Sequence, residues 1–402
     1  MTEGTAMQAG DRVLLGAEGL SALVAALRGD GFRVIGPVVR DGAIDYADVR
    51  GVEDLPVGWT EEQEAGRYRL RRRDDSALFG YAVGPRSLKP FLFAPKVTLV
   101  RLRRKEGGFV AEPGAPEAER LAVIGARPCD IAAVAVQDRT FLGTAGPPGA
   151  AGAPPLSPDA PGPHADPDYA ARRARLFIVA VQCGEPGGTC FCVSMGTGPR
   201  AERGFDLALT ELFEGEHRFL CEVGTEAGAA VLGRVATRPA AEGDIGAALA
   251  VTARAAGRMG RSTPAAEHRE LLARNLEHPR WDNVAARCLA CTNCTMVCPT
   301  CFCSTVEDTT DLSGETAERA RRWDSCFTLD HSYLSGSGPA RPSTRGRYRQ
   351  WLLHKLSTWY DQFGVSGCVG CGRCITWCPV GIDITEEVDA IRATDGEGAR
   401  RD

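Results

Sequence analysis

Cysteines repeated at one fixed spacing are the residues of this chain most suited to chemistry. The sequence of 402 residues contains 16 cysteines. Eight of them form two copies of the pattern CxxCxxCxxxCP, namely Cys288, Cys291, Cys294 and Cys298, and Cys368, Cys371, Cys374 and Cys378. This spacing is typical of [4Fe–4S] sites, in which each of the four irons takes one thiolate. The pattern therefore predicts two [4Fe–4S] clusters.

Ligands are expected to be exchanged between the two copies, as in bacterial two-cluster ferredoxins. The first three cysteines of a copy surround one cluster, and the fourth lies about one helical turn away, pointing at the other cluster. The predicted ligand sets are Cys288, Cys291, Cys294 and Cys378 for cluster 1, and Cys368, Cys371, Cys374 and Cys298 for cluster 2. Neither cluster has an open coordination position, so the pair is expected to transfer electrons, and no catalytic residue is predicted.

Structural zinc sites are the alternative for these eight cysteines. Such sites normally use two CxxC pairs or include histidine, and two complete copies of the longer pattern favour iron–sulfur clusters. The histidines show no ligand-like spacing and are interpreted as core or surface residues: His164, His217, His268, His278, His331 and His354.

The other eight cysteines fall into two groups and a single residue, Cys221. Three follow the first motif: Cys301, Cys303 and Cys326. Four lie in the first half, where a Gly-rich turn follows a predicted strand: Cys129, Cys183, Cys190 and Cys192. Glycine lets a backbone approach a cluster closely, so these four are the candidate ligands of a third [4Fe–4S] cluster. The alternative is that they are buried thiols that pack as small apolar groups.

Hydrophobic patterning predicts a mixed α/β domain over residues 1–240. Apolar residues three and four apart indicate a helix at 17–28. Other predicted elements are strands at 32–40 and 67–83, buried strands at 121–125 and 176–181, and a helix that Pro128 opens and that continues to about residue 136. Residues 144–168 are rich in Pro, Gly and Ala, and we expect a surface insertion without a chemical role there.

From about residue 241 the pattern becomes helical. Residues 243–258 are rich in alanine, and Thr263-Pro264 is expected to open a helix that ends near residue 278. An aromatic and leucine stripe predicts a further helix over 344–363, between the two motifs. With so long a spacer, residues 241–402 resemble the α-helical ferredoxin domain of fumarate-reductase-type iron–sulfur subunits. The predicted fold class is therefore α+β, with a mixed N-terminal domain and a helical dicluster domain.

Composition and charge predict where the protein is located and what it does not bind. Net charge is −5, and the sequence has no apolar run long enough for a membrane helix and no secretory pattern at its start. We therefore expect a cytoplasmic protein that binds neither nucleic acid nor membrane. The basic runs at 67–73 and 101–105 are interpreted as solvated faces. No Walker A loop or GxGxxG motif follows a strand, so no nucleotide site is expected in this chain.

Several motifs taken together identify a resemblance to a known family. They are Ile124–Asp130 (IGARPCD), the Cys183–Cys192 turn with its SMGTGP continuation, Cys298–Cys303 (CPTCFC), Trp323–Cys326 (WDSC) and the second cluster motif. The chain resembles, from about residue 85 to 390, the β subunit of cytosolic NAD(P)-linked [NiFe] sulfhydrogenases, which is similar to the electron-delivery subunit of anaerobic sulfite reductases.

The resemblance implies an iron–sulfur subunit of an oxidoreductase complex. Electrons would pass between a flavin subunit that binds NAD(P)H and the small subunit of a soluble [NiFe] hydrogenase, whose large subunit holds nickel. Two alternatives remain open. One is electron delivery to a sirohaem subunit in an anaerobic sulfite reductase. The other is a stand-alone polysulfide or disulfide reductase with a special third cluster.

Overall fold

The first half of the chain is built on an eight-stranded sheet. The computed structural model describes residues 7–114, 118–145 and 153–396. The strand order is β12-β1-β11-β10-β9-β8-β2-β3, in which β2, β8, β9 and β10 run parallel and the outer strands run antiparallel. The strands are β1 (Arg12–Gly16), β2 (Arg33–Arg40), β3 (Ala43–Asp48), β8 (Leu121–Ala126), β9 (Leu176–Val181), β10 (Leu207–Leu212), β11 (Arg218–Val223) and β12 (Arg238–Pro239).

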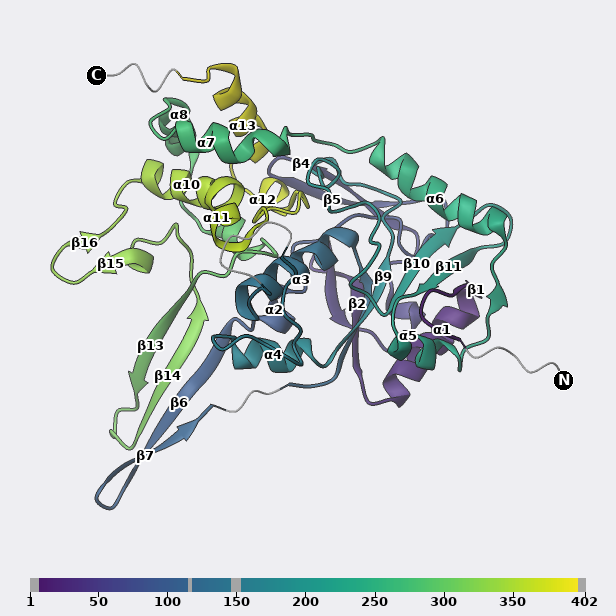
Figure 1. The fold of residues 1–402 in the computed structure, drawn as a ribbon, viewed down its shortest axis with the longest axis horizontal. Helices are drawn as coiled ribbons and strands as arrows, with labels where there is room; N and C mark the ends of the chain where they lie inside the picture. The colour runs from purple at the N-terminus through teal and green to yellow at the C-terminus, as the bar shows by residue number, and fades with distance from the viewer. Residues whose placement is uncertain (1–6, 115–117, 146–152, 397–402) are drawn as a thin grey trace.

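Helices cover both faces of this sheet (Figure 1). The central strands β8 and β9 are continuous apolar runs, as expected for parallel strands buried on both sides. One face packs against α1 (Ala17–Gly29) and α5 (Glu226–Leu232), and the other against α3 (Pro128–Phe141) and α6 (Glu242–Ala256). The predicted helix at 17–28 and the predicted strands at 32–40, 121–125 and 176–181 are confirmed within two residues.

The predicted strand at 67–83 is only partly correct. It ends at Arg72 as β5 (Arg67–Arg72), which pairs with β4 (Trp59–Glu64), and the chain then continues without regular structure. The predicted insertion at 144–168 lies partly outside the described residues. Its last described part caps α4 (Pro167–Arg173), because the Asp166 side chain accepts a hydrogen bond from the Tyr169 backbone N–H.

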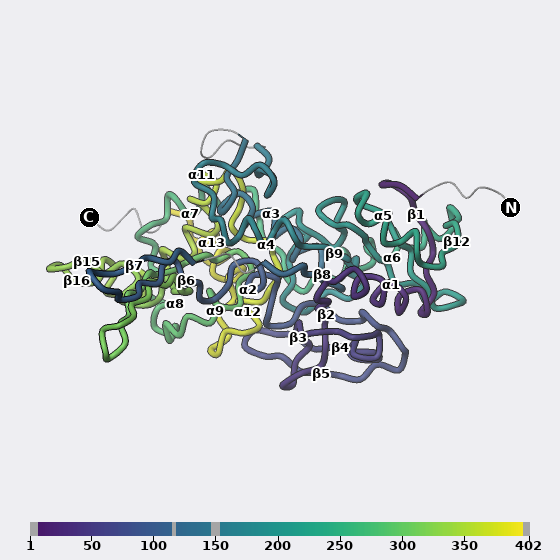
Figure 2. The backbone as a smooth tube through the Cα atoms, turned by 90° about the horizontal axis from the view of Figure 1, so that it is seen from below, coloured from purple at the N-terminus to yellow at the C-terminus, as the bar shows by residue number. Residues whose placement is uncertain are grey.

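The second half is mainly helical and lies beside the large sheet (Figure 2). Its helices are α7 (His268–Arg274), α8 (Arg280–Arg287), α9 (Asn293–Met296), α10 (Thr344–Leu353), α11 (Trp359–Phe363), α12 (Arg373–Thr376) and α13 (Ile384–Ala393). A π-helical turn at His354–Thr358 joins α10 to α11, which confirms the predicted helical segment at 344–363. The helix expected from Thr263 starts later, at His268, after a 3₁₀ turn at Ala265–Glu267.

A four-stranded sheet corrects the expectation of an all-helical second domain. The spacer between the cluster motifs contains a hairpin of β13 (Ser304–Thr310) and β14 (Thr316–Trp323). Strand β14 pairs with β6 (Lys96–Lys105) of the first half, which also pairs with β7 (Gly108–Pro113). The sheet therefore joins segments on both sides of the predicted boundary at residue 240, and it projects from the body of the protein (Figure 1).

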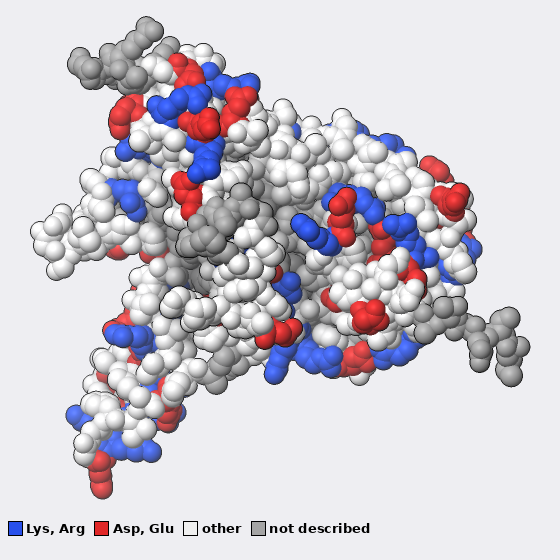
Figure 3. Space-filling model, in the orientation of Figure 1, with Lys and Arg blue, Asp and Glu red and all other residues white. Residues whose placement is uncertain are grey.

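Charged side chains of both signs are scattered over the projecting sheet (Figure 3). Glu318 on β14 pairs with Lys96 and Arg101 on β6. The basic run at 101–105 thus contributes to paired charges on a solvated sheet, as the sequence indicated. The short elements α2 (Lys89–Leu92), β15 (Tyr333–Leu334) and β16 (Gly338–Pro339) complete the fold. Within the described residues, no helix is both long and apolar enough to span a membrane.

Candidate metal centres

The first motif forms a loop between two helices. Cys288 directly follows α8, and Cys294 lies in α9. Between them, Ala290 and Thr292 both have positive φ angles, of 49° and 70°. This conformation turns the backbone N–H of Ala290 toward the sulfur of Cys288, at 3.4 Å. The loop therefore presents backbone donors toward its own cysteine sulfurs, as a cluster-binding loop requires.

The second motif repeats the same backbone conformation eighty residues later. Gly370 and Gly372 have φ angles of 64° and 74°, and the N–H of Gly370 lies 3.4 Å from the sulfur of Cys368. Glycine is required here by packing as well. A Cβ atom on Gly370 would come within 2.7 Å of the Cys192 backbone, and one on Gly372 within 2.4 Å of the Thr189 side chain. The second loop is thus pressed against the cysteine-rich turn of the first half.

The structure brings together the cysteines of each predicted ligand set. Burial raises the pKa of the Cys294 thiol, and the neighbouring thiols of Cys288, Cys378 and Cys291 raise it further. Cys288, Cys291, Cys294 and Cys378 also line one cavity, together with Cys374.

The second set is grouped in the same way. Burial raises the pKa of the Cys374 thiol, and its next strongest neighbours are Cys368, Cys298 and Cys371. Iron binds thiolates, so binding to thiols whose pKa is raised, such as that of Cys374, must be accompanied by proton release. Four thiol donors around each position fit a [4Fe–4S] cluster. Among the described residues, no three Cys, His, Asp or Glu side chains converge closely enough to hold a single metal ion.

A buried lysine contacts one of the predicted cluster ligands. Lys355 lies in the π-helical turn, and its Nζ atom donates to the Cys298 sulfur at 3.1 Å and to the Gly367 carbonyl at 3.0 Å. Burial by itself lowers the pKa of Lys355, but the nearby sulfurs of Cys298 and Cys301 outweigh burial and raise the pKa overall. The side chain is therefore a cation, 2% exposed, beside the second set. Sequence reasoning missed it, although a lysine inside an apolar helical stripe was a visible signal.

The four candidate cysteines of the first half also converge. Cys129 lies at the start of α3, Cys183 follows β9, and all four line one small cavity: Cys129, Cys183, Cys190 and Cys192. Cys371 of the second motif lines the same cavity. The position is the carboxyl end of the parallel strands, where α/β sheets commonly place their ligands.

Direct contacts connect this third group to the second motif. The N–H of Phe191 donates to the Gly370 carbonyl at 2.8 Å, and the Cys190 sulfur lies 3.8 Å from the Cys371 carbonyl oxygen. A hydrogen bond of 2.6 Å joins the hydroxyls of Thr189 and Thr376. The third group and the second motif are therefore packed backbone against backbone.

A buried ion pair lies between the same two segments. Arg373 Nη2 is 2.8 Å from Asp130 Oδ1, and each side chain is 1% exposed. Asp130 belongs to the Arg-Pro-Cys-Asp motif of the first half, and Arg373 to the second cluster motif. Removing one partner of such a pair leaves an uncompensated buried charge. The ion pair therefore explains why a charged residue occupies each of these two buried positions.

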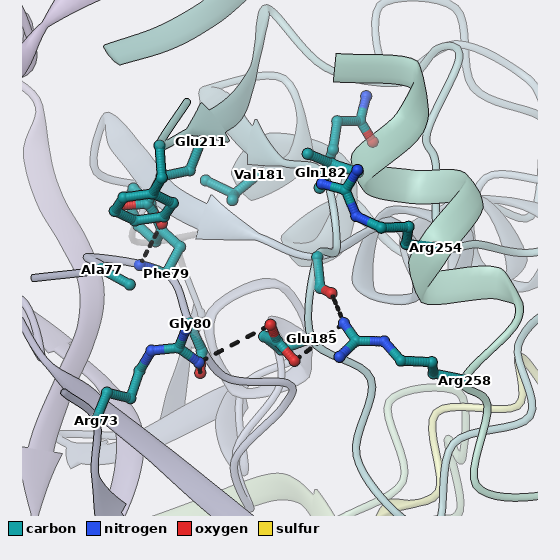
Figure 4. A pocket seen from close by; sticks show the side chains of 13 residues that line it. Arg73, Ala77, Phe79, Gly80, Val181, Gln182, Glu185, Glu211, Arg254 and Arg258 are labelled. Carbon is teal, nitrogen blue, oxygen red and sulfur yellow. Dashed lines mark hydrogen bonds and ion pairs between the residues drawn. The ribbon is translucent and has the colours of Figure 1, made fainter. Parts of the chain in front are cut away.

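A separate cavity of about 120 Å³ contains charged residues and no cysteine (Figure 4). Arg73 and Arg258 face Glu185 there, at 3.9 and 3.1 Å. Glu211 accepts hydrogen bonds from the backbone N–H groups of Leu78 and Phe79. The cavity's charges are largely satisfied within the protein, and we assign it no ligand. Cys221 is buried in β11 and is interpreted as a packing residue.

Comparisons with known proteins agree with this geometry. Residues 287–382 match a family model described as a 4Fe-4S dicluster domain. The chain is 28% identical over 362 residues to sulfhydrogenase 2 subunit beta of Pyrococcus furiosus, an alignment that covers 90% of this chain and 92% of that protein. No solved structure matches the chain. The comparisons confirm a ferredoxin-type iron–sulfur domain in the second half and a resemblance to a sulfhydrogenase β subunit along most of the chain.

Proposed function

We propose that the chain is the iron–sulfur electron-transfer subunit of a [NiFe] hydrogenase, relaying electrons between a flavin subunit that binds NAD(P)H and the hydrogenase small subunit. The observation that carries the proposal is the pair of cysteine sets, interleaved across two motifs within a matched dicluster domain. The similarity to a sulfhydrogenase β subunit extends over most of both chains, and it supports the assignment of this chain to a hydrogenase complex.

The first two proposed ligand sets are those predicted from spacing, and the third is the set expected at the Gly-rich turn of the first half. Cluster 1 takes Cys288, Cys291, Cys294 and Cys378, cluster 2 takes Cys368, Cys371, Cys374 and Cys298, and a third cluster takes Cys129, Cys183, Cys190 and Cys192. When bound, the clusters supply one-electron redox chemistry. The chain's own residues hold and tune them: backbone N–H groups face the sulfurs, and Lys355 places a positive charge beside Cys298.

The contacts support a linear path through the chain. Cys371 lines the cavity of the third group, and Cys374 lines the cavity of the first set, so the second set lies between the other two. The third group is buried, whereas Cys291 of the first set is exposed. Leu289 beside it is 63% exposed. We therefore place the exchange of electrons with one partner at the first set.

Purification of the native complex tests the proposal. We expect nickel in the complex and H₂-dependent reduction of NAD(P). Cys371→Ser should abolish that overall reaction while reduction of the flavin by NAD(P)H survives, and Cys221→Ala serves as the matched cysteine control. A complex that contains sirohaem and no nickel would overturn the hydrogenase assignment in favour of a sulfite reductase. Iron near twelve atoms per chain supports the third cluster, and eight contradicts it.

A further inference from the structure

Two cysteines outside the cluster motifs meet at the base of the projecting hairpin. Cys303 directly precedes β13, and Cys326 follows β14 by three residues. The register of the hairpin pairs Ser304 with Trp323, and the Asp324 N–H donates to the Cys303 carbonyl at 2.9 Å. The two thiols are hydrogen-bonded to each other, and both are partly exposed. Their accessibility distinguishes them from the buried third group.

A histidine and an aspartate complete this arrangement. His331 Nδ1 lies 2.9 Å from Asp324 Oδ2, and the ring also hydrogen-bonds the Cys303 thiol. Asp324 is held in turn by the backbone N–H of Ser325 at 2.7 Å and the hydroxyl of Thr328 at 2.9 Å. A thiol, an imidazole and a carboxylate in series form the arrangement that activates a cysteine nucleophile.

Local electrostatics fit this role. The Cys326 and His331 hydrogen bonds lower the pKa of Cys303 to about 4, and the contact with Cys303 raises the pKa of His331 to about 8. Lys89 and His354 also face Cys303, and Lys355 faces Cys326. Although cysteine and histidine are metal-ligand types, these side chains belong to no described group of three that could hold one metal ion. Thiol chemistry here rests on the hydrogen-bonded series of Cys303, His331 and Asp324.

We propose that Cys303 and Cys326 are a redox-active dithiol that reduces small-molecule disulfides. The Cys303 thiolate attacks one sulfur of RS–SR, the S–S bond breaks, and the first RS⁻ leaves with the proton of His331. Cys326 then gives its proton to His331 and attacks the Cys303 sulfur of the mixed disulfide. The second RS⁻ leaves with that proton. Two RSH are released, and the protein holds a Cys303–Cys326 disulfide.

The cycle closes with two electrons and two protons. Cys326 has Cys294 of the first set among its electrostatic neighbours, so the electrons are supplied singly by the iron–sulfur clusters and the protons by solvent. This regeneration rests on the proposed function, whereas the first half-reaction needs only the reduced thiols. The electron relay and the dithiol half-reaction can therefore be refuted separately.

A single-turnover experiment tests the dithiol in the full iron-loaded chain. The protein is reduced with a phosphine, freed of reductant without oxygen and mixed with hydroxyethyl disulfide. We expect two mercaptoethanol molecules per chain and a Cys303–Cys326 disulfide in the peptide map. Cys326→Ser should release one and retain the other on Cys303. Cys303→Ser should release none, and Cys221→Ala should release two.

Release that is unchanged in Cys303→Ser, or a peptide map that shows other cysteines linked, would overturn the proposal. Catalytic turnover driven by H₂ in the native complex is a separate measurement. Its loss alongside an intact single turnover would count against the electron relay and leave the dithiol standing.

Discussion

Replacing Lys355 with methionine should make the proposed cluster 2 harder to reduce. The change removes a buried positive charge and a donor 3.1 Å from the Cys298 sulfur. A unit charge at that distance interacts at about 5 kcal/mol for an effective dielectric constant of 20. If the added electron is shared equally among four cluster corners, the nearest corner alone loses about 1.3 kcal/mol, which corresponds to about 60 mV for one electron. The reduction potential should therefore fall by at least this amount.

The assay is an EPR-monitored redox titration of the iron-loaded chain. Methionine keeps the length and apolar stem of lysine, so iron content and melting temperature should change little. Lys96→Met is the matched control, because Lys96 is exposed on β6 and pairs with Glu318. The potential of cluster 2 should stay constant in that variant. An unchanged potential in Lys355→Met, with full iron content, would refute the role given to this cation.

Three further variants test packing and protonation. Asp130→Ala leaves the charge of Arg373 buried without its partner and should lower the free energy of unfolding, measured in urea, by about 3–5 kcal/mol. The double variant with Arg373→Met should recover this stability. If it does not, the two residues do not form a direct pair. Gly370→Ala adds steric overlap to a positive φ and should cost about 1–3 kcal/mol, more than Gly336→Ala, where φ is also positive but space is open. Burial lowers the pKa of His268 to about 4. Below about pH 6.5 the unfolded chain therefore binds the proton first, and stability should fall by about 3 kcal/mol between pH 6.5 and 4. His268→Gln should flatten this slope, and an unchanged slope would exclude His268 as its cause.

The three cysteines of each loop could be grouped from the sequence because their geometry is local, whereas the fourth ligand of each proposed set comes from the other motif. In each motif, spacing alone fixes which cysteines share a loop, and the same two positions adopt positive φ in both copies. The third group was also visible, since Cys183 follows an apolar strand. Its closeness to Cys371 was not, because that contact depends on how the two halves pack.

Other features escaped the sequence for physical reasons. Strands β13 and β14 are largely solvated on both faces, so they lack the apolar alternation that marks a strand. Strand β6, with which β14 pairs, lies about two hundred residues earlier in the chain. The spacing of His331 is not ligand-like and indicates only a core or surface residue. In the folded hairpin, His331 hydrogen-bonds both Asp324 and the Cys303 thiol.

The projecting sheet has a consequence for the order of assembly. Strand β6 is synthesised early but finds β14 only after residue 323 has been made. Pairing of segments so far apart in sequence is slow, because a long loop must close first. The proposed cluster 1 likewise needs Cys378, and cluster 2 needs both motifs. Nascent chains would thus carry an unpaired β6 edge and incomplete thiol sets for clusters 1 and 2 until synthesis is nearly finished, so iron delivery to these two clusters has to follow translation of the second motif.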